Sequence, residues 1–393
     1  MSIHLSKLFK NIYPFSDFLY LLQLEEYDSG RYFRLLPRFF WRRNIQNRGK
    51  LDITNRIKII YILSFPVSLV IPFLIPIVIG IVNVISKPAF DFAHSRLRSK
   101  AATYFRNHGG KTKVVAIAGS YGKTSTRIIL YNLLKYHFRV QTPPGNINTP
   151  TGIAEWILKE FKTQTEILII EVDTYFCGEI AESLNITPPD ISVLTTIGDQ
   201  HLERFQTKEN LELALMEIFE YAKEGVIQIR GTSENADAAV RIARHFKIPE
   251  DIIRDVLKKN VQPGRRGDII KFHNFSTIDN SYNISEQTAT NTLKKALLFA
   301  KECGKKLIVI TAGIPELGRE NANANKHIGM LINKQADVVI ILRSIFYEDI
   351  RSQISKSELQ SANSMQEVVK ILSLYAPSKY ILLLFPELTD AYY

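Results

Sequence analysis

The chain has 393 residues, of which 46% are apolar and 23% charged, and its formal net charge is +11. This length is too great for one hydrophobic core and predicts two or three domains, and the composition excludes a disordered, collagen-like or coiled-coil chain. Residues 1–113 carry 18 Lys and Arg against 6 Asp and Glu, whereas residues 114–393 carry 32 against 33. Because the basic charge is confined to the first quarter, we expect no nucleic-acid partner.

The first quarter contains 28 consecutive uncharged residues, from Ile59 to Ser86. A run of this length indicates a membrane-associated segment. As one straight helix it would extend about 42 Å, which exceeds the roughly 30 Å hydrocarbon core of a bilayer. Pro66, Pro72 and Pro76 argue against such a helix, because each proline removes a backbone donor and clashes with the preceding turn. The alternative interpretation is a pair of buried helices in a soluble domain.

Positive charge flanks this apolar run on both sides: residues 1–58 carry 11 basic and 5 acidic side chains, and residues 87–113 carry 7 and 1. Lys and Arg prefer the cytoplasmic side of a membrane. A hairpin bent near residues 72–76 places both basic flanks on that side, whereas a single span does not. However, 28 residues are too few for two full crossings of about 20 residues each. An upstream basic stretch is typical of an interfacial helix on an anionic membrane, or of a solvated basic face. It combines Arg31, Arg34, Arg38, Arg42 and Arg43 with Tyr32, Phe33, Phe39, Phe40 and Trp41.

After Lys113, short apolar runs alternate with helical patterns, which is typical of βαβ units around a parallel sheet. A predicted strand at residues 114–118 leads into a G-x-x-G-K-T turn and a helix near residues 126–136. This arrangement predicts a phosphate cradle in which backbone N–H groups face the anion, Lys123 reaches the terminal phosphates and the Thr124 hydroxyl holds Mg²⁺. The alternative is an ordinary strand-to-helix turn. The cradle consists of Gly119, Ser120, Tyr121, Gly122, Lys123, Thr124 and Ser125.

Two further predicted strands end in polar side chains, at the edge where open α/β sheets place their ligands. Residues 167–170 lead into Glu171-Val172-Asp173, and residues 191–195 lead into a segment that contains His201. A carboxylate and an imidazole at neighbouring strand ends are candidate ligands of Mg²⁺, which prefers oxygen. His201 alone is weak evidence, because a lone histidine more often has a structural role.

Several strings in this region resemble the central domain of the Mur ligases, the ATP-dependent enzymes that form amide bonds in peptidoglycan synthesis. They are AGSYGKTST, GNINTPTG, IIEVD followed by GEI, and PPDISVLTTIGDQHLERF. DNSYN and GIPELG, further on, are similar to the C-terminal domain of the branch that adds D-alanyl-D-alanine to a UDP-muramoyl tripeptide. The resemblance covers roughly residues 112–343.

The resemblance implies an α/β fold with a P-loop parallel-sheet central domain, expected at residues 111–262, and a smaller doubly wound C-terminal domain, expected at residues 263–393. Residues 1–110 form the expected helical, membrane-associated region. The resemblance also implies ATP and Mg²⁺ as cofactors. Carried over by position, it makes Lys123, Glu171 and His201 catalytic, assigns the metal to Thr124, Glu171 and His201, and adds Asn235, Arg265 and Asp279 to the nucleotide site.

Three departures from the family pattern stand out. The family places a metal-binding carbamylated lysine fourteen residues after the histidine, where this chain has Leu215. Several tens of residues are missing between a predicted strand at residues 225–230 and the helix expected at residues 236–246. The domain that grips the UDP sugar is replaced by the basic, apolar first quarter.

The expected function is an ATP-dependent carboxylate–amine ligase that acts through an acyl phosphate. Its expected partners are a UDP-linked or lipid-linked muramoyl peptide, an amino acid or dipeptide amine, and an anionic membrane. The alternative is a membrane-tethered nucleotide-binding scaffold. The two cysteines, Cys177 and Cys303, cannot cross-link a chain of this size, and no signal peptide is evident. We therefore expect the bacterial inner membrane, with the catalytic domains in the cytoplasm.

Overall fold

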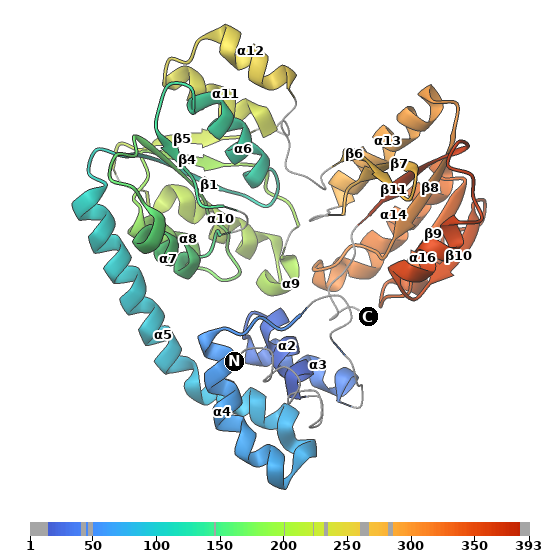
Figure 1. Cartoon of the computed structure of the whole chain (residues 1–393), viewed down its shortest axis with the longest axis horizontal. Helices are drawn as coiled ribbons and strands as arrows, with labels where there is room; N and C mark the ends of the chain where they lie inside the picture. The colour runs from blue at the N-terminus through green and yellow to red at the C-terminus, as the bar shows by residue number, and fades with distance from the viewer. Residues whose placement is uncertain are drawn as a thin grey trace. The chain divides into compact units, whose positions relative to one another are not determined.

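The computed structural model describes residues 15–40, 45, 50–144, 147–199, 201–222, 224–231, 235–259, 267–281 and 286–385. These residues form two compact units, with the division between Ser95 and Arg96 (Figure 1). The predicted N-terminal region extended to residue 110. The division lies earlier because Ala101 and Phe105, in the last part of a long helix, are buried in the core of the second unit.

The first unit is helical and contains α2 (Phe15–Leu24), α3 (Ser29–Phe39), α4 (Asn55–Val70), η1 (Pro72–Leu74) and the beginning of α5 (Ile75–His108). Its core joins side chains from the four α-helices, among them Phe18, Tyr32, Ile60 and Ile79. The apolar run does not form one straight helix, because η1 separates α4 from α5. One helical stretch, Pro72–His108, has the length and apolar composition to cross a membrane.

The chain reverses direction between α4 and α5. Arg56, in the first turn of α4, donates from Nη2 to the Asn83 Oδ1 of α5 at 2.9 Å, and its guanidinium lies over the Phe90 ring at 4.9 Å. These contacts bring the start of α4 next to residues 83–90, which a bend at η1 requires. The predicted hairpin bend near residues 72–76 therefore occurs in the structure.

The second unit begins with a five-stranded parallel sheet in the order β2-β3-β1-β4-β5. Its strands are β1 (Lys113–Ala118), β2 (Val140–Gln141), β3 (Ile167–Glu171), β4 (Ile191–Leu194) and β5 (Ile227–Arg230). The hydrophobic core on one face includes residues of α7 (Pro150–Glu160), α8 (Glu179–Ile186), α9 (Leu202–Phe205) and α10 (Lys208–Glu220). Because β1 lies between β3 and β4, the carboxyl ends of these three strands are neighbours.

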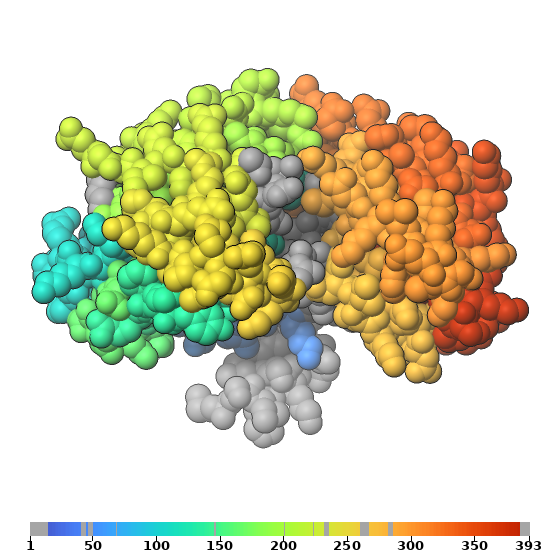
Figure 2. Space-filling model, turned by 90° about the horizontal axis from the view of Figure 1, so that it is seen from above, coloured from blue at the N-terminus to red at the C-terminus, as the bar shows by residue number. Residues whose placement is uncertain are grey.

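The other face of this sheet is covered by α6 (Lys123–Leu134), α11 (Asn235–His245) and α12 (Glu250–Lys258). The outer surface of α11 and α12, coloured yellow, faces the viewer in Figure 2. A hydrophobic layer on each side of a parallel sheet explains why β3 and β4 are buried throughout and β1 is buried at every residue after Lys113.

A second sheet follows in the order β10-β9-β8-β11-β7-β6, in which only β6 is antiparallel to its neighbour. Its strands are β6 (Asp268–Phe272), β7 (Phe275–Asp279), β8 (Lys306–Thr311), β9 (Val338–Leu342), β10 (Glu358–Ala362) and β11 (Tyr380–Leu384). The helices of this part are α13 (Glu286–Glu302), η2 (Gly318–Glu320), α14 (Asn321–Gln335), α15 (Tyr347–Arg351) and α16 (Met365–Leu372). The predicted α/β class is confirmed. β7 and the polar edge strand β10 were not among the predicted strands.

Candidate functional site

The turn between β1 and α6 is held in a conformation that requires glycine. Gly119 and Gly122 have φ angles of +134° and +88°. A Cβ atom at Gly119 would lie 2.0 Å from the Thr195 Oγ1 atom. The Thr195 hydroxyl donates to the carbonyl groups of Ala118 and Tyr121 at 3.0 and 2.7 Å, which fixes this loop to the end of β4. The predicted strand–turn–helix element is therefore present in the structure, and its binding of phosphate stays a prediction.

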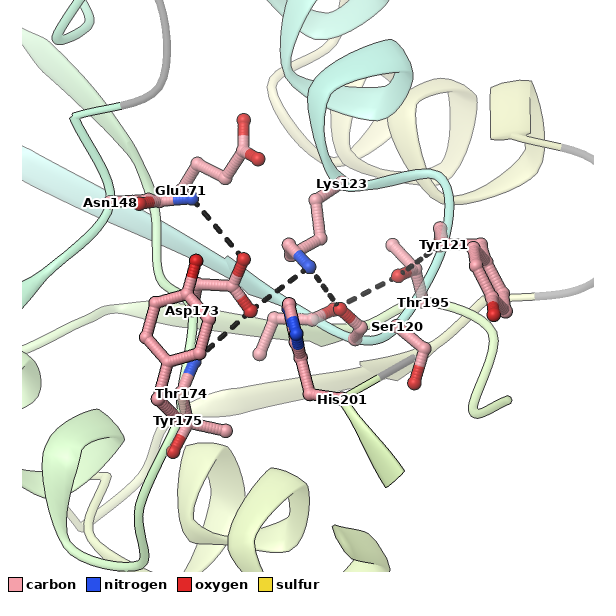
Figure 3. A network of polar contacts seen from close by, with 12 residues as sticks. Ser120, Tyr121, Lys123, Asn148, Glu171, Asp173, Thr174, Tyr175, Thr195 and His201 are labelled. Atoms are coloured by element: carbon pink, nitrogen blue, oxygen red, sulfur yellow. Dashed lines mark hydrogen bonds and ion pairs between the residues drawn. The ribbon is translucent and has the colours of Figure 1, made fainter. Parts of the chain in front are cut away.

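Lys123 is the first residue of α6, and its side chain folds back toward the start of this loop. Its Nζ donates to the Gly119 carbonyl at 2.5 Å and to Asp173 Oδ1 at 3.2 Å. Asp173 also accepts from the Asn148 side chain at 3.3 Å and from the Thr174 backbone N–H at 3.0 Å (Figure 3). Both side chains of the Lys123–Asp173 ion pair are less than one tenth exposed. The pair therefore supplies a buried, hydrogen-bonded ammonium group where the terminal phosphates are expected.

Glu171, the last residue of β3, lies against the first turns of α6. Its Oε1 accepts from the Thr124 hydroxyl at 2.9 Å, and its Oε2 accepts from the Arg127 Nε at 3.2 Å. Arg127 also donates from Nη1 to the Pro143 carbonyl at 2.9 Å. A hydroxyl and a carboxylate oxygen side by side suit Mg²⁺, so Thr124 and Glu171 fit the predicted metal site. Among the described residues, no group of three or more His, Cys, Asp and Glu side chains is arranged so that it could hold a metal ion.

His201 follows β4, and its backbone adopts the left-handed conformation, with a φ of +60°. Its Nδ1 lies 2.6 Å from Glu316 Oε2, and the Glu203 backbone N–H donates to the Glu316 carbonyl at 2.9 Å. The Tyr175 ring packs edge-on against the imidazole, with 4.6 Å between the ring centroids. Two elements distant in sequence, the loop after β3 and the G-I-P-E-L-G loop, thus hold His201 in place.

The other predicted site residues have different outcomes. Ser125 is buried in the first turn of α6. Asp279 ends β7 and is buried, and its Oδ1 accepts from the Ser281 N–H at 3.0 Å. Asn235 begins α11. Arg265 lies outside the described residues. Leu215, at the position of the family lysine, lies in α10, is 2% exposed and belongs to the hydrophobic core.

Four functional candidates escaped the sequence analysis: Arg127, Asn148, Asp173 and Glu316. Asp173 follows Glu171 by two residues in a string already singled out, so its position carried a usable signal. Arg127 lies one helical turn after Lys123, which places both on one side of α6. Asn148 and Glu316 also lie in strings already singled out, but their roles depend on partners 25 and 115 residues away in the sequence.

Comparisons with known proteins agree with this architecture. Residues 117–285 match the Mur ligase middle domain family. The chain is 37% identical over 136 residues to the UDP-N-acetylmuramoyl-tripeptide–D-alanyl-D-alanine ligase of Rickettsia prowazekii, a match that covers 35% of this chain and 30% of that protein. It is 31% identical over 139 residues to the Bacillus subtilis protein of the same name, with 35% and 30% covered. The chain thus spans less than a third of these curated relatives.

A solved structure extends the likeness of fold beyond the matched family region. The MurF ligase of Thermotoga maritima, solved in complex with ADP, has a TM-score of 0.67 at 23% identity, over 75% of this chain and 80% of that one. The α/β architecture of the second unit is therefore that of a Mur ligase. Residues 117–285 thus match the Mur ligase middle domain in sequence, and the second unit is similar to a Mur ligase in fold.

Proposed function

We propose that this protein is an ATP-dependent carboxylate–amine ligase of the Mur type, acting on a muramoyl-peptide cell-wall precursor at the cytoplasmic face of the membrane. The observation that carries the proposal is the buried Lys123 ammonium group in a glycine-formed phosphate cradle, within residues that match the Mur ligase middle domain. The strand-end carboxylates beside it supply the acidic groups that a nucleotide-bound metal requires.

In the proposed reaction the acceptor carboxylate attacks the γ-phosphorus of ATP, which breaks the bond to the β-phosphate oxygen and releases ADP. The resulting acyl phosphate is attacked by an amine, phosphate leaves, and an amide remains. Lys123 binds the transferred phosphoryl group and stabilises its charge, with the backbone N–H groups at the start of α6 as further donors. Mg²⁺, held by Thr124 and Glu171, would neutralise charge on the phosphates.

The substrates are proposed from the names of the relatives. The matched curated proteins are ligases of UDP-N-acetylmuramoyl-tripeptide and D-alanyl-D-alanine. We therefore propose a muramoyl peptide as acceptor and an amino acid or dipeptide, with D-alanyl-D-alanine as the first to test, as the amine. The acceptor is UDP-linked or lipid-linked, and a membrane-attached enzyme has access to both.

Membrane attachment is supported by the exposed apolar surface of the first unit. Large apolar side chains project from α4, η1 and α5, including Ile62, Leu69, Val70, Phe73 and Ile85, each more than half exposed. No charged residue occurs between Lys58 and Lys87. Each arm of the hairpin contributes 12 residues to the run, or about 18 Å of helix, which is slightly more than the ~15 Å depth of one leaflet. The hairpin therefore suits insertion into one leaflet with both basic flanks on the same side.

The product identifies the reaction. Full-length protein in detergent is incubated with ATP, Mg²⁺, D-alanyl-D-alanine and either UDP-muramoyl tripeptide or its lipid-linked counterpart, and products are found by mass spectrometry. We expect an amide product whose mass equals the sum of the two substrates less one water, with one ADP per amide. Saturable ATP binding without turnover on either acceptor would instead support the nucleotide-binding scaffold.

A further inference from the structure

Arg127 is a buried cation that the proposed reaction does not yet use. It lies on α6 one turn after Lys123, and its side chain is 8% exposed. Its Nε donates to Glu171 Oε2 at 3.2 Å, and its Nη1 donates to the Thr142 hydroxyl at 3.3 Å and the Pro143 carbonyl at 2.9 Å. One side chain thus joins the phosphate-binding helix, the end of β3 and the loop that follows β2.

The two oxygens of Glu171 have separate partners. Oε2 is bound by the Arg127 guanidinium, whereas Oε1 accepts from the Thr124 hydroxyl at 2.9 Å. A carboxylate held at one oxygen cannot rotate freely, so its other oxygen stays at a defined place beside the Thr124 hydroxyl. Partners behind a metal ligand act in this way in other metal sites, where their loss weakens metal binding about 10–100-fold.

We propose that Arg127 is a positioning residue that holds Glu171 Oε1 and the Thr124 hydroxyl ready for the magnesium ion of the bound nucleotide. This inference rests on the proposed function, because it assumes that the cradle binds a magnesium nucleotide. The planar guanidinium suits the task, since it can donate to Glu171 and to Pro143 from different nitrogens at once. A lysine ammonium is a point charge without this fixed fork, so it cannot reproduce both contacts in the same geometry.

The same guanidinium also fixes the start of the loop that leads to α7. The end of that loop is bound independently, because the Asp173 backbone N–H donates to the Asn148 carbonyl at 3.0 Å and the Asn148 side chain donates to Asp173 Oδ2. Arg127 and Asn148 therefore connect this loop to Glu171 and to Asp173, the two carboxylates beside Thr124 and Lys123. Displacement of Arg127 would move Glu171 and the loop together.

The test measures ATP binding to the full-length protein by calorimetry, with and without Mg²⁺, for the wild type and Arg127→Lys. We expect Arg127→Lys to bind ATP in EDTA within about twofold of the wild type, whereas the Mg²⁺ concentration for half-maximal enhancement rises about 10-fold or more. Arg98→Lys is the matched control, because Arg98 Nη2 pairs with Glu182 Oε1 at 2.9 Å and this pair includes no residue of the cradle. It should leave both affinities unchanged.

An unchanged Mg²⁺ requirement in Arg127→Lys overturns the proposal, as does an equal loss of ATP affinity with and without Mg²⁺. A wild type whose ATP affinity does not respond to Mg²⁺ overturns it too. A structure of the wild type with Mg²⁺ and ADP tests it without a variant: Glu171 should keep its Arg127 contact while it faces the metal, and a displaced Arg127 refutes the role. A wild type that behaves as expected in binding but forms no amide refutes the ligase function alone.

Discussion

The Nζ of Lys123 lies 3.2 Å from Oδ1 of Asp173, and both side chains are almost fully buried. Removal of one partner from a buried ion pair leaves an unpaired charge and typically costs about 3–5 kcal/mol. Asp173→Asn should therefore lower the free energy of unfolding by that order in the absence of nucleotide. Saturating ATP should reduce the difference in free energy of unfolding between Asp173→Asn and the wild type. The phosphates of bound ATP then neutralise the charge of the Lys123 ammonium group.

Urea unfolding with and without ATP measures both effects. Glu155→Gln is the control, because the Glu155–Lys159 pair is exposed and should contribute less than about 1 kcal/mol. A loss of stability in Asp173→Asn that ATP leaves unchanged would contradict the assignment of Lys123 to the phosphates.

The proposed reaction depends on Glu171, a proposed ligand of Mg²⁺, and on His201, which the family resemblance makes catalytic. Replacement of either by Ala should abolish acceptor-dependent ADP release, because Glu171→Ala removes a metal ligand and His201→Ala removes the imidazole held between Tyr175 and Glu316. A coupled ADP assay with the muramoyl peptide measures the rate. Unchanged turnover in both variants would show that the metal assignment is wrong.

Deletion of the first unit separates membrane attachment from nucleotide binding. A protein that begins at Arg96 keeps Ala101 and Phe105 in the core of the second unit and loses the apolar hairpin. We expect it to remain in the supernatant after ultracentrifugation and to bind ATP as the full-length protein does. If it still floats with anionic vesicles, the hairpin is not the membrane anchor.

Glu179, in the first turn of α8, gives the stability of the second unit a defined pH dependence. Burial raises the pKa of Glu179, and the N–H groups of Tyr175 and Phe176 only partly offset this. A raised carboxyl pKa contributes stability that is fully present below the unfolded pKa, about 4.5, and is lost as the pH rises through the folded pKa. Glu179→Gln should remove this contribution.

The midpoints of urea unfolding of the wild type and Glu179→Gln, measured from pH 4 to pH 7, test this pH dependence. The stability of the wild type relative to Glu179→Gln should fall as the pH rises through the window just above about 4.5. A relative stability that rises with pH over the same range would show that Glu179 favours its charged form in the folded state.

Local features of the site were predictable from the sequence, and long-range contacts were not. The cradle around Lys123 depends on consecutive residues, so the glycines and the adjacent apolar strand were sufficient to predict it. The ion pair between Lys123 and Asp173 depends on β3 lying next to β1, which neither segment specifies alone. The contact between His201 and Glu316 was unpredictable for the same reason, because His201 follows a strand of the first sheet and Glu316 follows a strand of the second.

The errors in the fold prediction have related causes. Hydrophobic runs revealed β1, β3 and β4 because these strands are buried on both faces. The edge strand β10 has few buried residues and therefore lacks that signal. The expected boundary at residue 110 follows the change of sequence pattern after Lys113, whereas residues 101 and 105, in the last part of α5, belong to the core of the second unit.

The central claim is that a carboxylate of the acceptor is phosphorylated by ATP before the amide forms. The most direct measurement uses muramoyl tripeptide labelled with ¹⁸O in its terminal carboxylate, with ATP, Mg²⁺, D-alanyl-D-alanine and the full-length protein. The acyl-phosphate route transfers one carboxylate oxygen to phosphate, so each amide formed should yield one phosphate that carries a single ¹⁸O. Amide formation accompanied by unlabelled phosphate would contradict the account.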